Sequence, residues 1–340
     1  MRLIRFDRWQ TGVMVTDDEF VDIGASIAAV SRRDAAAGAI LSEVLGGDRM
    51  DWRPMIERWD DVRTALEALL ELAKSDSAGC VVRRLSHVSL LAPLPSPSPR
   101  VFALGSNFAD HGARAKSKIL GRVVTEEEIV EDYNLGLPPW GYLVLPSSIV
   151  PSGAEVTPAD EVTMLDYEVE VAIVLRSGGK RLALDEVSVW GYTGWNDLSI
   201  RDHYFKVGPA IDRGILLWTL QKNFDGGNPC GVWMCVDENA DVQSLPMVLR
   251  VNGEQRQSST SAKMIYSFAE TAAHLSEYVR LEPGDMITSG TPAGPVLEQG
   301  MDGHYLQPGD EIEIEVGDAG VLRTTIGKMA AGSKKGKEVS

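Results

Sequence analysis

The chain has 340 residues with a hydrophobic content of 44%, enough to bury one large core or two modest ones. Its formal net charge of −16 argues against a surface for nucleic acid or anionic membranes, since both would repel it, so small molecules or other proteins are the expected partners. The three cysteines make neither a disulfide framework nor a zinc motif, and charges interrupt the first residues, so we expect no signal peptide, no membrane span and a cytoplasmic location.

The first ninety or so residues have a pattern of their own. Short apolar runs predict strands at 3–6 and 11–15, and apolar residues at helical spacing predict helices over 26–45 and 61–74. The proline-rich run 93–99 can continue neither kind of element and is typical of a linker. We therefore expect a small N-terminal α+β domain over 1–92, a larger domain over 93–330 and a disordered tail over 331–340.

Strand-like runs separated by turn signals dominate the larger domain. One helix is expected at 267–279, where apolar residues recur at helical spacing, and the acidic segment 122–132 is expected to be a solvated helix or a mobile loop. The predicted strands lie at 101–104, 143–145, 169–175, 231–236, 247–251, 286–289 and 311–316. The fold class is therefore predicted to be α+β and predominantly β.

Two glutamates, Glu168 and Glu170, open the most informative of these runs. Side chains two positions apart on a strand point to the same face, so the two carboxylates stand side by side. The apolar residues that follow do not alternate with polar ones, which indicates a strand covered on both faces, although periodicity alone leaves a solvated face open. Two adjacent buried carboxylates need a compensating cation, and oxygen ligands suit Mg²⁺ or Mn²⁺ better than zinc.

The run 311–316 repeats this glutamate spacing in another setting. Here glutamates and apolar residues alternate strictly, which is typical of an antiparallel strand with one face in water. For this second strand we predict a solvated face and no site.

Asp197 and His111 are the next candidates for chemistry. Asp197 ends a run of small and apolar residues and could give the cation a third carboxylate, or it could simply cap a turn. His111 follows the predicted strand 101–104 and could serve as a general base, because its ordinary pKa lies near working pH, although a lone histidine is more often structural.

Lys222 and the turn that begins at Gly290 complete the set. Lys222 could present its ammonium group to an anionic oxygen, or lie at the surface as most lysines do. Gly290 and Thr291 follow the predicted strand 286–289 and offer backbone N–H groups and a hydroxyl to a carboxylate, or form a plain turn.

Taken together, these segments resemble the fumarylacetoacetate hydrolase family from about residue 93 to 327, and the N-terminal residues resemble the small leading domain of many members. The resemblance is carried by Asn107-Phe-Ala-Asp-His111, Asp166-Tyr-Glu-Val-Glu170, Gly191-Tyr-Thr-Gly-Trp-Asn-Asp197 with Arg201-Asp202, Lys222-Asn-Phe-Asp225, Val251-Asn-Gly-Glu254 and the segment from Leu281 to Gly294. Their order and spacing are more specific than any one of them.

The resemblance implies a mixed β-roll catalytic domain, usually dimeric, with Mg²⁺ or Mn²⁺ held at Glu168, Glu170 and Asp197. It also implies that His111 activates water and that Lys222 lies beside a developing enolate. Thr291 is implied at the substrate carboxylate. The substrate-binding candidates are Arg201, Gly290 and Thr291, joined by Arg114 and Tyr204.

Arg114 and Tyr204 are departures from the family pattern, as is Leu145. Many members place a glutamate three residues after the histidine, where this chain has Arg114. A catalytic carboxylate from the acidic segment could close over the site instead, with Glu126, Glu127 and Glu128 as candidates. Tyr204 and Leu145 point to a less anionic or more aromatic substrate, whereas an inward-facing Arg114 points to the opposite.

The predicted function is metal-dependent hydrolysis of a C–C bond in an acylpyruvate-type 1,3-diketo acid such as fumarylpyruvate, giving pyruvate and a carboxylic acid. Isomerisation, decarboxylation or dehydration of a 2-oxo acid through a metal-stabilised enolate is the alternative, because function depends on the site and not the fold. A third possibility is a protein that binds a ligand without catalysis. The expected partners are a small 2-oxo acid and a second copy of the chain in a homodimer.

Overall fold

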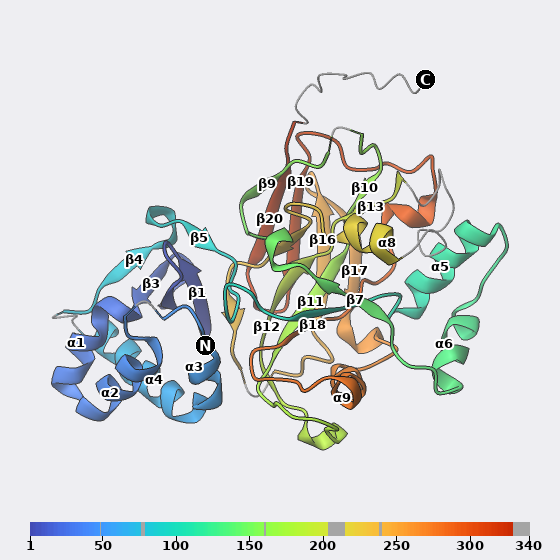
Figure 1. Ribbon diagram of the computed structural model, residues 1–340. Helices are drawn as coiled ribbons and strands as arrows, with labels where there is room; N and C mark the ends of the chain where they lie inside the picture. Colours follow the sequence, from blue (N-terminus) through green and yellow to red (C-terminus); the bar gives the residue numbers. More distant parts are fainter. Residues whose placement is uncertain (48, 76–78, 160, 203–214, 238–239, 329–340) are drawn as a thin grey trace, which may run out of the picture.

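The computed structural model of the protein describes all residues except 48, 76–78, 160, 203–214, 238–239 and 329–340 (Figure 1). The predicted tail over 331–340 and the candidate Tyr204 therefore lie outside the described residues. No helix among the described residues combines the length and the apolar character needed to cross a bilayer.

The N-terminal region contains strands and helices in mixed order. Its elements are β1 (Arg2–Phe6), β2 (Gln10–Met14), β3 (Glu19–Asp22), α1 (Ile23–Arg33), α2 (Ala35–Leu45), α3 (Arg53–Glu57), α4 (Trp59–Lys74), β4 (Val82–Arg84) and β5 (Leu90–Leu91). The helical pattern expected over 26–45 is divided between α1 and α2, because Asp34 has an extended backbone between them. Its carboxylate accepts a hydrogen bond from the backbone N–H of Ala37 and so begins a second helix.

This region is joined to the rest of the protein through a shared sheet. Strand β1 pairs antiparallel with β15, so β1 to β4 extend the large sheet at one end. Trp52 and Trp59 pack edge-on against Trp190 of the large sheet, with ring centroids 5.7 and 5.3 Å apart. The proline-rich run is also partly in the core, because Leu94 is only 3% exposed and its carbonyl accepts a hydrogen bond from buried Arg5. The domain boundary near residue 93 stays a prediction.

The larger region is mainly β. Its strands are β6 (Val101–Leu104), β7 (Gly141–Val144), β8 (Ile149–Pro151), β9 (Ala154–Val156), β10 (Leu165–Asp166), β11 (Val169–Leu175), β12 (Val189–Asn196), β13 (Ser199–Ile200), β14 (Asn228–Cys230), β15 (Met234–Cys235), β16 (Pro246–Val251), β17 (Glu254–Thr260), β18 (Met286–Thr288), β19 (Glu311–Val316) and β20 (Val321–Ile326). Its helices are α5 (Ala109–Leu120), α6 (Glu126–Asn134), α8 (Ile215–Lys222) and α9 (Phe268–Tyr278). The expected strand over 231–236 shortens to β15, whereas the helix expected at 267–279 is confirmed by α9, which begins with a capping box of Ser267 and Glu270.

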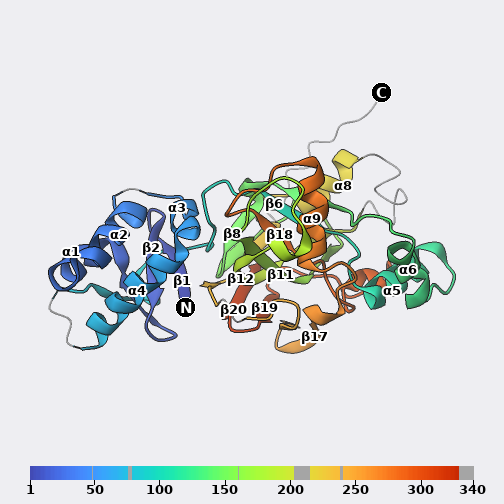
Figure 2. The same cartoon turned by 90° about the horizontal axis from the view of Figure 1, so that it is seen from below.

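Two sheets enclose the core around β11. The large sheet runs β4-β3-β2-β1-β15-β12-β11-β18-β6-β7, and a five-stranded sheet runs β17-β16-β19-β20-β9. In Figures 1 and 2 the N-terminal elements lie at one end of the molecule and α5 and α6 at the other, with β11 between them.

Every residue of β11 is buried, as its unbroken apolar run predicts. Val169, Val171 and Ile173 join the core shared with the five-stranded sheet, whereas Ala172 and Val174 join the core that continues to the N-terminal helices. Because strand side chains alternate, Glu168 and Glu170 lie on the side of Ala172 and Val174.

Candidate metal centre and acid–base pair

The pairing of β11 with β12 brings three carboxylates together. The antiparallel register places Val169 opposite Asn196, so the next residues outward, Glu168 and Asp197, meet at the strand ends. The backbone N–H of Asp197 donates to the carbonyl of Glu168 at 3.0 Å. One oxygen from each of Glu168, Glu170 and Asp197 lies within 4.8 Å of the others, and all three residues are buried. The triad expected at this position is thus assembled.

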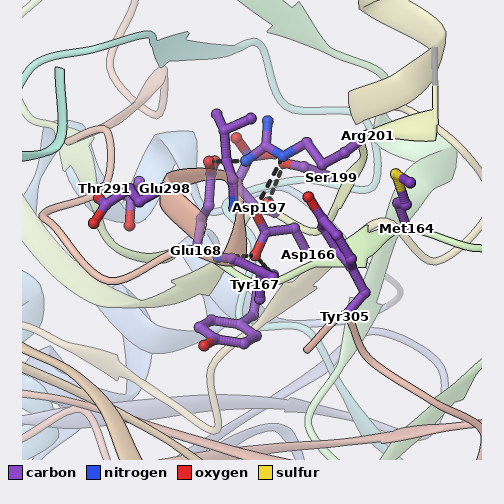
Figure 3. A network of polar contacts seen from close by, with 12 residues as sticks. Met164, Asp166, Tyr167, Glu168, Asp197, Ser199, Arg201, Thr291, Glu298 and Tyr305 are labelled. Carbon is purple, nitrogen blue, oxygen red and sulfur yellow. Dashed lines mark hydrogen bonds and ion pairs between the residues drawn. The ribbon is translucent and has the colours of Figure 1, made fainter. Parts of the chain in front are cut away.

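Two buried cations neutralise part of this negative charge, and Figure 3 shows one of them, Arg201, beside Glu168 and Asp166. The Nζ atom of Lys222, at the end of α8, lies 2.5 Å from Oε2 of Glu168 and 2.6 Å from Oδ2 of Asp197. Arg201 donates to Glu168 and, at 3.1 Å, to Asp166. Although burial alone would raise it, these two cations hold the pKa of Glu168 well below its usual range. Arg201, expected to bind substrate, therefore contacts carboxylates of the protein itself.

The remaining charge imbalance shows that the triad fits a divalent cation. Oε2 of Glu170 and Oδ1 of Asp197 are buried without a hydrogen-bond partner among the described residues. Burial, together with Asp197 and Glu168, raises the pKa of Glu170 well above its usual range. Burial likewise raises the pKa of Asp197 to about 6, against the opposing effect of Lys222. Carboxylates short of positive charge, with free oxygens converging, are the donor set that Mg²⁺ or Mn²⁺ prefers.

His111 lies in the first turn of α5 and is held by a carboxylate that the sequence analysis did not identify. Its Nδ1 is 2.8 Å from Oε1 of Glu298, in the short 3-10 helix η6 (Val296–Gln299). Glu298 also accepts from the backbone N–H of Gly294 at 3.0 Å. Both His111 and Glu298 are buried, and the positive charge of a protonated His111 would further lower the pKa of Glu168. With Nδ1 occupied, Nε2 is the ring nitrogen left for a water molecule or a substrate.

The carboxylate beside His111 in this structure is Glu298, and a catalytic role for Glu126, Glu127 or Glu128 stays a prediction. These three residues form the exposed first turn of α6, and Glu128 is engaged in a capping box with Thr125 and an ion pair with Arg122. Glu126 does line a surface hollow of about 670 Å³ that also reaches Arg114 and Glu298. A closing movement of α6 stays a prediction.

Arg114, which replaces the expected glutamate, pairs with the carboxylate that holds His111. Its side chain is 63% exposed, and Nη1 lies 3.5 Å from Oε2 of Glu298, whereas His111 contacts the other carboxylate oxygen. Arg114 therefore faces the acid–base pair rather than bulk solvent alone.

Gly290 and Thr291 follow β18 as expected. Gly290 has a φ of 73°, and a Cβ there would lie 3.1 Å from Cβ of Asn107, so glycine is required for the turn. Thr291 is 4% exposed, and its hydroxyl accepts a hydrogen bond from the side chain of Gln257.

Tyr142 of β7 is a further polar group at the triad that the sequence analysis missed. Its hydroxyl is buried beside Asp197, and burial, followed by the charges of Asp197 and Glu170, raises its pKa well above the usual range. The alternation of β7, in which Tyr142 and Val144 are buried and Leu143 is exposed, is the signal that could have indicated an inward tyrosine.

Comparison with known proteins places this arrangement in context. The family model described as fumarylacetoacetate (FAA) hydrolase C-terminal matches residues 100–327. Oxaloacetate tautomerase YisK from Bacillus subtilis (strain 168) is 29% identical over 328 residues, which cover 95% of this chain and 97% of the relative.

Two solved structures share the fold over nearly the whole chain. A probable 2-hydroxyhepta-2,4-diene-1,7-dioate isomerase from Mycobacterium abscessus is 26% identical with a TM-score of 0.63, covering 97% of this chain and 98% of that one. Maleylpyruvate hydrolase from Sphingobium sp. SYK-6, in complex with manganese(II) and pyruvate, is 22% identical with a TM-score of 0.67, covering 97% and 100%.

Proposed function

The chain belongs to the fumarylacetoacetate hydrolase family and is an enzyme of it, and on this premise we propose that it hydrolyses a C–C bond of an acylpyruvate-type 1,3-diketo acid with the help of Mg²⁺ or Mn²⁺. The observation that carries the proposal is the contact of 2.8 Å between His111 and Glu298 beside the acidic triad. Hydrolysis needs a general base, and a histidine fixed by a carboxylate can act as one. Glu298 supplies the carboxylate that Arg114 cannot.

The three carboxylates of Glu168, Glu170 and Asp197 would hold the cation. When bound, a divalent cation supplies a Lewis acid for the carboxylate and keto oxygens of a 2-oxo acid. The structural neighbour solved with manganese(II) and pyruvate supports this choice of metal and ligand class.

His111 and Glu298 would carry out the first proton transfer. The Nδ1–H of His111 donates a hydrogen bond to Glu298, which fixes the tautomer and leaves Nε2 free to take a proton from water. The resulting hydroxide attacks the carbonyl carbon remote from the 2-oxo acid group, and the bond between that carbon and the methylene carbon breaks. The products are a carboxylic acid and the enolate of pyruvate.

Lys222 would serve the second half of the reaction. Its ammonium group is buried between Glu168 and Asp197, so it places positive charge where the enolate oxygen develops. Lys222 helps to neutralise the enolate or donates the proton that converts it to pyruvate.

A second candidate function, tautomerisation of a 2-oxo diacid, is favoured by the similarity to an oxaloacetate tautomerase over 95% of the chain. The same base at His111 could remove a proton from carbon rather than from water, with no bond between carbons broken. Both reactions require a 2-oxo acid and the same metal.

Assays of the purified protein with Mn²⁺ distinguish hydrolysis from tautomerisation. Hydrolysis of an acylpyruvate removes the absorbance of its enol form and releases pyruvate, which lactate dehydrogenase detects. Tautomerisation of oxaloacetate changes the enol absorbance without releasing pyruvate. Turnover of neither compound, in the presence of bound Mn²⁺, would refute the proposal. The homodimer and the cytoplasmic location stay predictions.

A further inference from the structure

Gln257 of β17 connects the strand of the metal ligands with the loop of Thr291. It is 1% exposed and lies in the sheet opposite β11. Its Oε1 accepts from the backbone N–H of Val169 at 2.9 Å, and its Nε2 donates to Oγ1 of Thr291 and to the carbonyl of Pro292, both at 2.9 Å. One buried amide thus makes three hydrogen bonds to two separate segments.

The orientation of the Gln257 amide is fixed by two backbone groups, one of which can only donate a hydrogen bond and the other only accept one. The N–H of Val169 can only donate, so it must face the amide oxygen, and the carbonyl of Pro292 can only accept, so it must face the amide nitrogen. The second hydrogen on that nitrogen then points at Thr291, whose hydroxyl oxygen must accept it. If the amide were rotated, its NH₂ group would face the N–H of Val169 and its oxygen would face the carbonyl of Pro292, and both contacts are unfavourable in a buried site.

This arrangement determines where the proton of Thr291 can go. The hydroxyl cannot donate to Gln257, and no hydrogen bond from it to another described residue is present. Figure 3 shows Thr291 and Glu298 on the same side of Glu168. We propose that Gln257 is a positioning residue that holds Thr291 as a hydrogen-bond donor to the carboxylate of the 2-oxo acid, an inference that rests on the proposed function.

The same amide relates the carboxylate subsite to the metal subsite. Val169 lies between Glu168 and Glu170, so Gln257 fixes the backbone of the metal ligands and the direction of the Thr291 hydroxyl together. The loop is also held to β11 by Ser289, whose hydroxyl accepts from the N–H of Val171 at 3.0 Å. A ligand of this site would then meet both the cation held by the triad and the hydroxyl donor of Thr291, as the carboxylate of a 2-oxo acid can.

Two substitutions of Gln257 separate positioning from a purely structural role. Q257E keeps an acceptor for Val169 but replaces the donor with a second acceptor, which takes the proton of Thr291. Q257M removes all three hydrogen bonds and leaves the hydroxyl free to turn. Q257E also places a carboxylate against the carbonyl of Pro292, so the loss of stability is measured for both variants by melting temperature. Positioning predicts that, of the two folded variants, Q257E binds the ligand more weakly.

The measurement is the Kd of oxalate by calorimetry with Mn²⁺ at saturation, since oxalate resembles the carboxylate and keto oxygens of a 2-oxo acid. We expect an increase of about 10- to 100-fold for Q257E and of about 2- to 10-fold for Q257M, with the Kd of Mn²⁺ changed less than that of oxalate. Q255E makes the same chemical change at an exposed position of the same strand and is expected to bind oxalate as the wild type does.

Thr291 provides a second route should Q257E fail to fold. In wild-type protein T291V is expected to weaken oxalate binding about 10- to 100-fold, and in the Q257M background to weaken it by a smaller factor. Additive effects, or Q257M as the weaker binder of the two Gln257 variants, would overturn the inference while the proposed function stands. Failure of the wild type itself to bind oxalate with Mn²⁺ would overturn both.

Discussion

Strands β11 and β19 carry glutamates at the same spacing and use them in opposite ways. Glu168 and Glu170 are 4% and 1% exposed at the start of a strand whose every residue is buried. In β19 the burial alternates, so that Ile312 and Ile314 enter the core while their neighbouring glutamates remain accessible. The spacing sets which residues share a face, and the covering of that face decides what the glutamates do.

The difference is one of electrostatic compensation. Glu313 and Glu315 of β19 meet Arg323 and Arg250 across the strand, where water screens any remaining charge. The buried carboxylates have Lys222 and Arg201 for partners, and Oε2 of Glu170 makes no hydrogen bond among the described residues. A buried unpaired carboxylate costs several kcal/mol, so a bound cation is expected at β11 and not at β19.

The largest expected effect comes from neutralising one glutamate in each strand. E170Q removes a proposed ligand with almost no change in size, so we expect activity to fall about 10³-fold or more and the Mn²⁺-dependent rise in melting temperature to disappear. E313Q, the matched change in β19, should leave both unchanged. Retention of the Mn²⁺ shift by E170Q would break the comparison, because the two strands would then respond alike.

A smaller loss of activity is expected from a change at the acid–base pair of His111 and Glu298. E298Q keeps the size of the side chain but removes the charge that holds His111, so kcat should fall about 10²-fold. The Kd of Mn²⁺ should stay within a fewfold of the wild-type value, since Glu298 is not among the three proposed ligands. A parallel loss of Mn²⁺ binding in calorimetry would show that Glu298 supports the metal site instead.

The contrast between the two strands could be predicted from the sequence, because it depends on local periodicity. The meeting of Glu168 with Asp197 also has a local cause, since it follows from the register of two strands joined along the chain. The contact between His111 and Glu298 joins positions 187 residues apart, and a single glutamate after a turn carries no pattern that indicates its partner.

Other differences from the sequence analysis have the same origin in side-chain contacts. The helical spacing over 26–45 did not indicate the break at Asp34, whose carboxylate caps the following helix. Lys222 was expected beside an enolate, and the structure shows it first as a counter-charge for two carboxylates. Gln257 gave no signal at all, because its role depends on contacts with Val169 of β11 and with Thr291 in the loop after β18, both distant in sequence.

A third prediction concerns pH. Metal ions bind carboxylates that have lost their protons, so protonation of Asp197, with its pKa of about 6, competes with Mn²⁺. Affinity is therefore retained above that pH and lost as the pH falls through it, by about tenfold per unit for each proton displaced. The raised pKa of Glu170 acts in the same direction, so binding of the metal is expected to displace protons as the pH falls. Calorimetry in buffers of different ionisation enthalpy measures that release, and a Kd independent of pH between 5 and 7 would contradict it.

The smallest effect is expected on the wet face of β19. Glu313 lies directly opposite Arg323, with Oε1 3.0 Å from Nε, but the arginine is 62% exposed and the glutamate 33%. Exposed pairs of this kind stabilise proteins by about 0.2–1 kcal/mol, because water screens the charges and the side chains lose freedom on pairing. E313A and R323A should each lower the free energy of unfolding in urea by no more than that amount, and the double variant should add little. A loss of about 3 kcal/mol for either single variant would show that β19 depends on its charges as a buried strand does, and the distinction between the two strands would then rest on the metal alone.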